Sequence, residues 1–211
     1  MVTRHLTPRQ VETSSDEVTK RVFDFLFAML VVLLLLSWFI PLMALIIKLD
    51  SPGPVFFRQL RSGRYNIPFY CLKFRSMKVN GEADSLQASK EDARITRVGA
   101  FIRKTSIDEL PQFLNVLIGD MSVVGPRPHM LKHTEQYAQI IDNFMDRHYI
   151  TPGITGWAQI KGLRGETRET KAMVARVNAD LWYLYNRSLF LDIKIIFLTI
   201  WMYGKLYQNA F

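Results

Sequence analysis

One apolar stretch constrains this chain more than any other feature. Residues 22–47 read VFDFLFAMLVVLLLLSWFIPLMALII, which is 26 residues long. A helix needs roughly 20 apolar residues to span a bilayer, and a cleaved secretory signal has a shorter apolar region followed by a small-residue cleavage site. We therefore expect a membrane helix. Its one charged residue, Asp24, follows Lys20 and Arg21 at a spacing that allows an ion pair on a helix.

The flanks and the middle of this stretch bear on its topology. Basic residues lie on both sides of it, Lys20 and Arg21 before, and Lys48, Arg58, Arg61 and Arg64 after. Because basic flanks favour the cytoplasm, both ends are expected on the same side. Ser37 and Pro41 lie inside, where proline removes a backbone donor and serine can bond a freed carbonyl. A helix that breaks and returns and an ordinary kinked span both remain open.

The rest of the chain is long enough for one domain. It has 211 residues in all, a net charge of +8 and a single cysteine, Cys71, which excludes an internal disulfide. We expect a polar, flexible terminus over 1–19, the membrane helix over 20–49 and a single domain over 50–211. The positive charge favours an anionic partner, either a lipid headgroup or a phosphorylated substrate. No recognised nucleic-acid motif accompanies it, so we expect no nucleic acid as partner.

Two strands are expected after the membrane helix, over 55–60 and 68–77, around a turn at Ser62-Gly63. Alternation places Lys73 and Arg75 on the same face as Phe69 and Cys71, and Tyr70, Leu72 and Phe74 on the other. We expect the second face to pack on the domain, so that Lys73 and Arg75 project together. They form either a solvated basic surface or a pair of cations for an anion.

The remaining elements are predicted to be mostly helical, in an α/β fold that is mostly α. Residues 98–105, 110–119 and 170–186 suit helices, 80–93 a loop or marginal helix, and 152–166 an ordered glycine-rich loop. The apolar segment 188–204 suits an amphipathic helix at the headgroup level of a membrane, or else a buried core helix. His129 and His133 have a zinc-chelating spacing, but no third ligand accompanies them, and we interpret them as part of a solvated helix face.

The adjacent carboxylates Asp108 and Glu109 admit two interpretations. Residues 106–109, SIDE, match a capping box, in which Glu109 reaches back to the cap amide of Ser106, and this needs no function. The same helix start, with Arg103 nearby, would also lower the pKa of Asp108 and favour an ionised nucleophile. An anionic phosphorus target would then need cations and a divalent metal. The candidates are Lys73, Arg75, Arg103 and Arg127, with Glu109 as a hard oxygen ligand for Mg²⁺.

A family resemblance favours the catalytic interpretation of Asp108 and Glu109 over the capping box. The runs KRVFDF, SPGPVFFRQ, LKFRSM, RKTSIDELPQFLNVLIGDMSVVGPRP, PGITGWAQIKG and LDIKIIFLTIW resemble, in order, the bacterial sugar transferases of the monotopic polyprenyl-phosphate phosphoglycosyl transferase type. The resemblance covers about residues 20 to 211, and its long DELPQ…GPRP block is highly specific.

The resemblance implies a fold, a reaction and a site. The fold would be an N-terminal re-entrant membrane helix with a small β-hairpin and interfacial amphipathic helices, in the bacterial inner membrane with the catalytic domain on the cytoplasmic face. Asp108 would attack the β-phosphorus of a UDP-sugar and release UMP, and undecaprenyl phosphate would then take the phosphosugar. Glu109 matches the residue linked to Mg²⁺. The matches to substrate-binding cations are Lys73, Arg75, Arg103 and Arg127.

One departure and several alternatives remain. The family commonly has Ser-Pro at the membrane-helix break, whereas this chain has Ser37-Trp38 with Pro41 three residues later. The C-terminal part resembles enzymes that transfer glucose or galactose 1-phosphate, in the first membrane step of exopolysaccharide, capsule or O-antigen synthesis. We expect a catalytic core, as a small natural enzyme or a trimmed one, with a homodimer as one possible state. The alternatives are a non-catalytic membrane-surface module and a nucleotide-sugar hydrolase.

Overall fold

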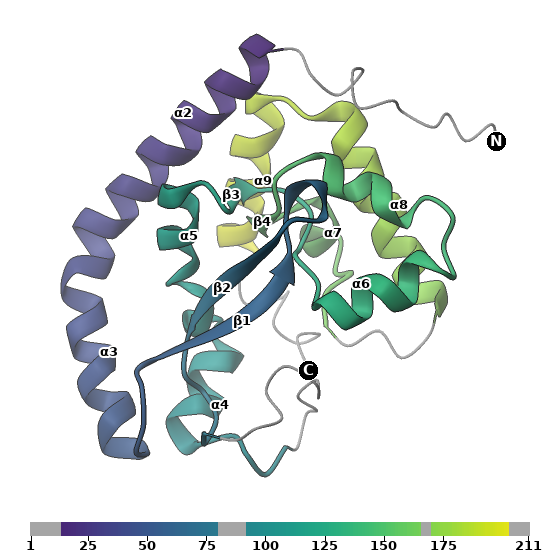
Figure 1. Ribbon diagram of the computed structural model, residues 1–211. Helices are drawn as coiled ribbons and strands as arrows, with labels where there is room; N and C mark the ends of the chain where they lie inside the picture. The colour runs from purple at the N-terminus through teal and green to yellow at the C-terminus, as the bar shows by residue number, and fades with distance from the viewer. Residues whose placement is uncertain (1–13, 80–91, 166–169, 203–211) are drawn as a thin grey trace.

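A long curved helix runs along one side of the molecule in the computed structural model, which describes residues 14–79, 92–165 and 170–202 (Figure 1). It consists of α2 (Ser14–Val31), a π-helical turn η1 (Val32–Leu36) and α3 (Ser37–Asp50). The flexible terminus expected over 1–19 was wrong for residues 14–19, which form the start of α2. The expectations for residues 1–13, 80–91, 166 and 203–204 lie outside the described residues.

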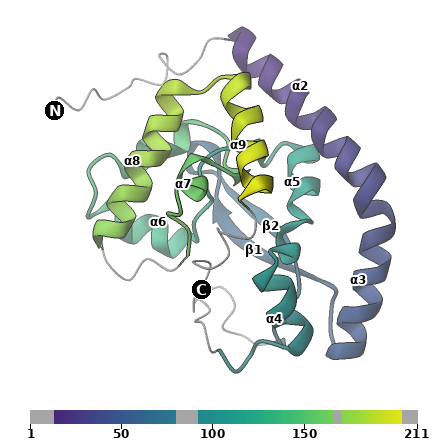
Figure 2. The ribbon, with the colours of Figure 1, turned by 180° about the vertical axis from the view of Figure 1, so that it is seen from behind.

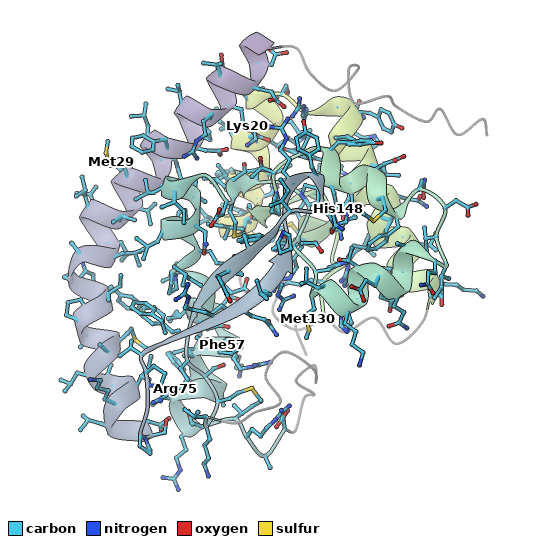
Figure 3. The ribbon with its side chains drawn as sticks, in the orientation of Figure 1. Lys20, Met29, Phe57, Arg75, Met130 and His148 are labelled. Carbon is cyan, nitrogen blue, oxygen red and sulfur yellow. The ribbon has the colours of Figure 1, made fainter. Side chains whose placement is uncertain are left out.

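This helix is long and apolar enough to cross a membrane. Unlike a core helix, it is mostly exposed; Leu34, for example, is 69% exposed, and the side chain of Met29 points away from the body (Figure 3). Both of its ends nevertheless pack on the same domain, α2 on α5 and α3 on α4. Arg21 fastens the first end, because its guanidinium donates to the carbonyls of Val116 at 2.6 Å and Leu117 at 2.8 Å.

The expected irregularity in the middle of this helix is a bend. The backbone N–H of Ser37 donates to Val32 O, five residues back, which makes the turn π-helical. Ser37 Oγ donates to Leu33 O at 2.7 Å, and the indole Nε1 of Trp38 donates to Leu34 O at 3.0 Å. Pro41 lies inside α3, four residues beyond Ser37. Two side chains thus serve the carbonyls of the π turn, and the helix continues through it.

The ion pair expected at the start of the membrane helix is present, and it is part of a buried network. Lys20 Nζ lies 3.3 Å from Asp24 Oδ1 and 2.8 Å from Asp192 Oδ2. Asp24 also accepts the backbone N–H of Val123 at 3.1 Å. Asp24 therefore faces the domain, where it joins the long apolar helix to β3 and, through Lys20, to α9.

The predicted β-hairpin is confirmed. Strand β1 (Phe56–Ser62) pairs with β2 (Pro68–Phe74) in antiparallel register, with Phe57 opposite Lys73. The prediction of which face packs was wrong in part, because Phe69 and Cys71 are buried while Tyr70 is exposed. The hairpin meets two separate apolar clusters. Phe69 and Cys71 enter the main core, whereas Phe74 packs against α3 and α4 from the opposite face.

The rest of the domain confirms the expected helices and adds a second small sheet. The strands β3 (Ser122–Val124) and β4 (Gly153–Thr155) pair in parallel, which the sequence did not predict. The remaining elements, seen from both sides in Figures 1 and 2, are η2 (Arg64–Asn66), α4 (Arg97–Lys104), η3 (Ile107–Glu109), α5 (Gln112–Ile118), α6 (Leu131–Ala138), η4 (Phe144–Tyr149), α7 (Trp157–Ile160), α8 (Thr170–Asn186) and α9 (Leu189–Trp201). The described part of the chain is mostly helical, as expected.

Helix α9 combines features of both predictions made for it. Leu191 and Ile195 are buried in the main core, as in a core helix. Phe190 and Trp201 are 79% and 77% exposed, so the helix also presents large apolar side chains on the surface.

Candidate active site

Asp108 and Glu109 do not form the capping box that the sequence allowed. They lie in the short 3-10 turn η3, and Ser106 before them adopts a left-handed conformation, with φ of 46°, and caps nothing. The Glu109 side chain turns to three cations instead of the Ser106 amide. The capping explanation for the two carboxylates is therefore wrong.

Glu109 is the centre of a charged group, which we name the Glu109 cluster: Glu109, Lys73, Arg127 and Arg164. Lys73 Nζ lies 2.8 Å from Glu109 Oε1, and Arg127 binds both oxygens, at 2.5 Å and 3.1 Å. Arg164 Nη2 lies 3.4 Å from Oε2 and donates to Ser106 Oγ at 2.7 Å. Burial opposes the charge of Glu109, but Arg127, Lys73 and Arg164 outweigh it and hold the pKa well below its usual range.

The surroundings of Asp108 shift its pKa in the opposite direction from that of Glu109. Asp108 is buried, and within the described part of the chain its carboxylate accepts no hydrogen bond and forms no ion pair. Burial raises its pKa to about 6; Glu109 adds to the rise, while Lys73 and Arg103 oppose it. The lowered pKa expected from the sequence was wrong, because desolvation outweighs the nearby cations. A carboxylate that is ionised at neutral pH and bound to nothing is suited to act as a nucleophile.

Separate elements bring the cations to this point. Lys73 lies on β2, and Asn115 of α5 holds the main chain of this strand. The Asn115 side chain accepts the Leu72 N–H at 2.9 Å and donates to Tyr70 O at 2.8 Å. Arg103 lies in the last turn of α4 and acts on Asp108 through its charge. Arg127 lies in the loop after β3. Of the predicted site residues, Lys73, Arg103, Arg127 and the two carboxylates are therefore brought together.

Arg75 is not brought to the cluster, contrary to the expectation that it projects beside Lys73. Its strand ends at Phe74, and its buried guanidinium donates to Pro52 O at 2.8 Å and Ser51 O at 2.5 Å. These carbonyls follow the end of α3, beside which Figure 3 shows Arg75. The unpaired carbonyls at a helix end attract a cation. This explains why Arg75 is drawn away from the carboxylates.

The sequence analysis missed Arg164, which completes the Glu109 cluster. It lies between Gly162 and Gly165, both with positive φ, in the segment assigned only as an ordered loop. An arginine between two glycines is a weak signal by itself. Only the fold places it opposite Glu109, 55 residues earlier in the chain.

The donor set offers little to a metal ion without a substrate. No group of three or more His, Cys, Asp or Glu side chains forms a metal site among the described residues. Mg²⁺ often takes one or two carboxylates and completes its shell with water and substrate phosphates, and Asp108 and Glu109 fit that pattern. Both Glu109 oxygens already bind cations, so one contact would have to yield, most easily that of Arg164 at 3.4 Å.

The solvated helix face expected for the histidine pair was wrong for His129, whereas His133 is partly exposed. No metal site includes either of them among the described residues. His129 precedes α6 and is buried, with Nδ1 2.9 Å from Arg147 Nη1. Burial and the neighbouring Arg147 hold its pKa well below the usual range. His129 is therefore a neutral packing residue.

Comparison with known proteins agrees with this geometry. Residues 15–205 match the model of the bacterial sugar transferase family. The UDP-glucose:undecaprenyl-phosphate glucose-1-phosphate transferase of Escherichia coli (strain K12) is 53% identical over 88% of this chain and 40% of its own length. The exopolysaccharide production protein PSS of Rhizobium leguminosarum bv. phaseoli is 47% identical over 88% of this chain and 94% of its own length.

A third relative carries a different sugar in its name. The UDP-N-acetylgalactosamine-undecaprenyl-phosphate N-acetylgalactosaminephosphotransferase of Aeromonas hydrophila is 46% identical over 86% of this chain and 42% of its own length. The chain thus spans about two fifths of the relatives from Escherichia coli and Aeromonas hydrophila. On the match of the family model and these identities, the chain belongs to the bacterial sugar transferase family.

Proposed function

We propose that this protein transfers hexose 1-phosphate, of the glucose or galactose type, from a UDP-sugar to undecaprenyl phosphate. The observation that carries the proposal is the pairing of Asp108, which is buried and has no hydrogen bond or ion pair among the described residues, with Glu109, which holds three cations beside it. Relatives of both lengths are named for undecaprenyl-phosphate transfer or exopolysaccharide production. The reaction would be the first membrane step of exopolysaccharide, capsule or O-antigen synthesis.

The proposed reaction has two displacement steps at one phosphorus atom. An oxygen of Asp108 attacks the β-phosphorus of the UDP-sugar, the bond to the bridging oxygen breaks, and UMP leaves with that oxygen. The phosphosugar is then an acyl phosphate on Asp108. A phosphate oxygen of undecaprenyl phosphate next attacks the same phosphorus. The bond to Asp108 breaks, the carboxylate is regenerated, and undecaprenyl diphosphosugar is the product.

The charges around Asp108 suit both steps. Lys73, Arg127 and Arg164 meet at Glu109, and their side chains keep some exposure, so phosphate oxygens can compete for them. Cations already held at the point where charge develops stabilise a phosphoryl transfer state without reorganisation. Mg²⁺, held by Glu109 and Asp108 together with the diphosphate, would supply further charge neutralisation there.

The topology that we propose is re-entrant, with the domain on the cytoplasmic face of the inner membrane. Both ends of the long helix pack on one domain, and that domain cannot lie on both sides of a bilayer. The exposed apolar middle of the helix and the basic flanks on both sides support the same arrangement. Reagents that label cysteines introduced at positions 20 and 50 from only one side of sealed vesicles would support it. Labelling of the two positions from opposite sides would contradict it.

UMP release measured with and without undecaprenyl phosphate separates this proposal from its rivals. A transferase releases at most one UMP per protein without the lipid and many with it. A hydrolase releases UMP continuously without lipid, and a membrane-surface module releases none. Either of these two results, across UDP-glucose, UDP-galactose and UDP-N-acetylgalactosamine, would contradict the proposal.

A further inference from the structure

A second buried group of charges lies next to the loops that carry Arg127 and Arg164. Arg147 Nη2 lies 2.6 Å from Asp180 Oδ2, and both side chains are almost fully buried. Arg176, one turn before Asp180 on α8, is also buried, and it interacts with Asp180 through its charge. We name these three residues the Asp180 cluster. None of them touches Glu109 or Asp108 in a hydrogen bond or ion pair that the structure shows.

Arg147 holds the main chain of the loop that carries Arg127. Its Nη2 donates to Arg127 O at 2.8 Å. Pro126 and Pro128 flank Arg127 and have no backbone N–H, so this loop depends on its carbonyls for anchorage. The neutral ring of His129 lies 2.9 Å from the other guanidinium nitrogen and steadies it. Arg147 therefore fixes the main chain of Arg127 and leaves the side chain of Arg127 to bind Glu109.

Arg176 holds the main chain of the loop that carries Arg164. Its Nε donates to Leu163 O and its Nη2 to Gly165 O, both at 2.9 Å. These are the carbonyls on either side of Arg164. The backbone N–H groups of Gly162 and Leu163 donate to Gln159 O and Ala158 O, both at 3.0 Å, so Arg176 holds the carbonyl side of a loop whose N–H side is held by α7. A forked guanidinium binds two carbonyls at once, which a lysine amine does not do in the same way.

The negative charge of Asp180 is needed where these arginines converge. Burial, with the charges of Arg127 and Arg147, lowers the pKa of Arg176 to about 10. Three guanidiniums thus repel one another in a buried region, and Asp180 opposes that repulsion. Without it, Arg147 and Arg176 would be buried cations with no anion nearby among the contacts that the structure shows, which is costly.

We propose that Asp180, Arg147 and Arg176 are positioning residues, which grip the main chain of two loops so that Arg127 and Arg164 meet at Glu109. The inference rests on the proposed function for its chemical meaning, since the two arginines would bind the diphosphate of the donor sugar. Residues of the Asp180 cluster touch neither substrate nor reacting atoms. They act only through Arg127 and Arg164.

A double-mutant cycle tests the link between Arg176 and Arg164. Arg176→Lys, Arg164→Ala and the double variant are compared in the full chain in detergent, by the affinity for UDP in calorimetry and by the rate of Asp108 adduct formation from UDP-glucose. Arg176→Lys keeps the charge but loses the two-carbonyl grip, and misplacement by about 1 Å can cost about 10²-fold in rate. We expect that loss in the single variant and no further loss from Arg176→Lys once Arg164 is alanine. Losses that multiply would show an independent structural effect and overturn the proposal.

Asp180→Asn and Asp192→Asn form a matched pair of controls. Both aspartates are buried on neighbouring helices and paired with a cation, but Asp192 binds Lys20 and Tyr183 rather than a residue of either loop. We expect both variants to lower thermal stability, and only Asp180→Asn to lower UDP affinity and the adduct rate per folded molecule. Equal effects of the two variants on these rates and affinities would overturn the proposal.

The two readouts also separate this inference from the proposed function. If the wild-type protein binds UDP but forms no adduct, the covalent mechanism fails, while the cycle in UDP affinity still decides the positioning role. If the wild-type protein forms the adduct and the cycle is additive, the reaction stands and the positioning role fails. If it neither binds UDP nor forms an adduct, both are overturned.

Discussion

Two kinds of arginine, partly exposed and buried, occupy different regions of this molecule. In the Glu109 cluster, Arg127 and Arg164 bind a carboxylate, and their side chains are 25% and 14% exposed. In the interior, Arg75, Arg147 and Arg176 bind main-chain carbonyls, and Arg147 is only 2% exposed. A carbonyl of the fold is a permanent partner. The Glu109 carboxylate is buried, but its arginine partners are partly exposed and can pass to a phosphate, so the first kind suits the proposed reaction and the second fixes the shape.

Asp108→Asn should give the largest effect, because it removes a buried carboxylate that pairs with no other described residue and is therefore available for attack. We expect turnover to fall by at least about 10⁴-fold, as for the loss of a nucleophile in other enzymes, with the fold retained in circular dichroism. The exposed Asp142, changed to Asn, is the control and should leave turnover unchanged. Normal turnover in Asp108→Asn would show that the unpaired carboxylate is not the nucleophile.

Glu109→Gln should break the Glu109 cluster itself. Lys73, Arg127 and Arg164 would lose the anion that holds them together, and removing one partner of a buried ion pair costs about 3–5 kcal/mol in the free energy of unfolding. We expect turnover to fall by about 10²- to 10³-fold as well. Denaturant unfolding measures the first effect.

Glu17→Gln is the control for this prediction. Glu17 pairs with Arg64 at 2.8 Å, but both side chains are more than a quarter exposed. Surface pairs contribute about 0–1 kcal/mol, so its loss should be small. Equal unfolding free energies for the two variants would mean that the Glu109 cluster contributes no more than a surface pair.

The pH dependence of adduct formation should follow the ionisation of Asp108 and not that of Glu109. The nucleophile must be ionised, and burial raises its pKa to about 6, whereas the pKa of Glu109 stays well below its usual range. The rate of adduct formation should therefore fall about tenfold per pH unit below pH 6 and be flat above it. Lys73→Met should move this limb to higher pH, because Lys73 is the cation that opposes the rise most. A limb near pH 4 would contradict the desolvated state of Asp108.

The stability of the fold should favour protonated Asp108, whereas the reaction needs ionised Asp108. The folded-state pKa of Asp108 lies above its ordinary value of 3.8, so its contribution to stability is fully present below about pH 4 and is lost as pH rises through 6. Asn imitates the protonated acid. Asp108→Asn should therefore be more stable than wild type at pH 7, by up to about 3 kcal/mol, and not at pH 4. A variant less stable than wild type at pH 7 would contradict this.

Arg75→Gln should have the smallest effect on the reaction. Its guanidinium binds Pro52 and Ser51 carbonyls after α3, so we expect a loss of about 1–3 kcal/mol in the free energy of unfolding. The adduct rate per folded molecule should change little. A loss of rate without a loss of stability would assign Arg75 to the substrate, as the family resemblance had suggested.

Much of the local structure follows from sequence pattern. The hairpin, the short helices α4 and α5 and the long apolar helix all appear where periodicity and turn residues predict them. The pattern did not reveal which strand face packs, because Phe69 and Phe74 enter different cores on opposite faces. It also missed the pairing of β3 with β4, since parallel strands whose paired residues are 31 positions apart leave no local signal.

The site was predictable through its motifs, and its electrostatics were not. The block containing Asp108, Glu109 and Arg127 pointed to residues that the structure brings together, and their chemical roles stay predictions. It did not indicate that Asp108 is desolvated, or that Arg164 completes the cluster, because both depend on packing between distant segments. Arg75 shows the converse: its alternation with Lys73 suggested a shared role, but its guanidinium binds main-chain carbonyls just past the end of α3.

The central claim is that Asp108 becomes covalently attached to the phosphosugar, and intact mass spectrometry tests it most directly. The purified full chain is incubated with Mg²⁺ and UDP-glucose or UDP-galactose, without lipid acceptor, beside Asp108→Asn and Asp142→Asn. We predict a hexose-phosphate adduct on the wild type and on Asp142→Asn, absent from Asp108→Asn and discharged by undecaprenyl phosphate. The same adduct on Asp108→Asn, or continuous UMP release with no adduct on the wild type, would contradict the account.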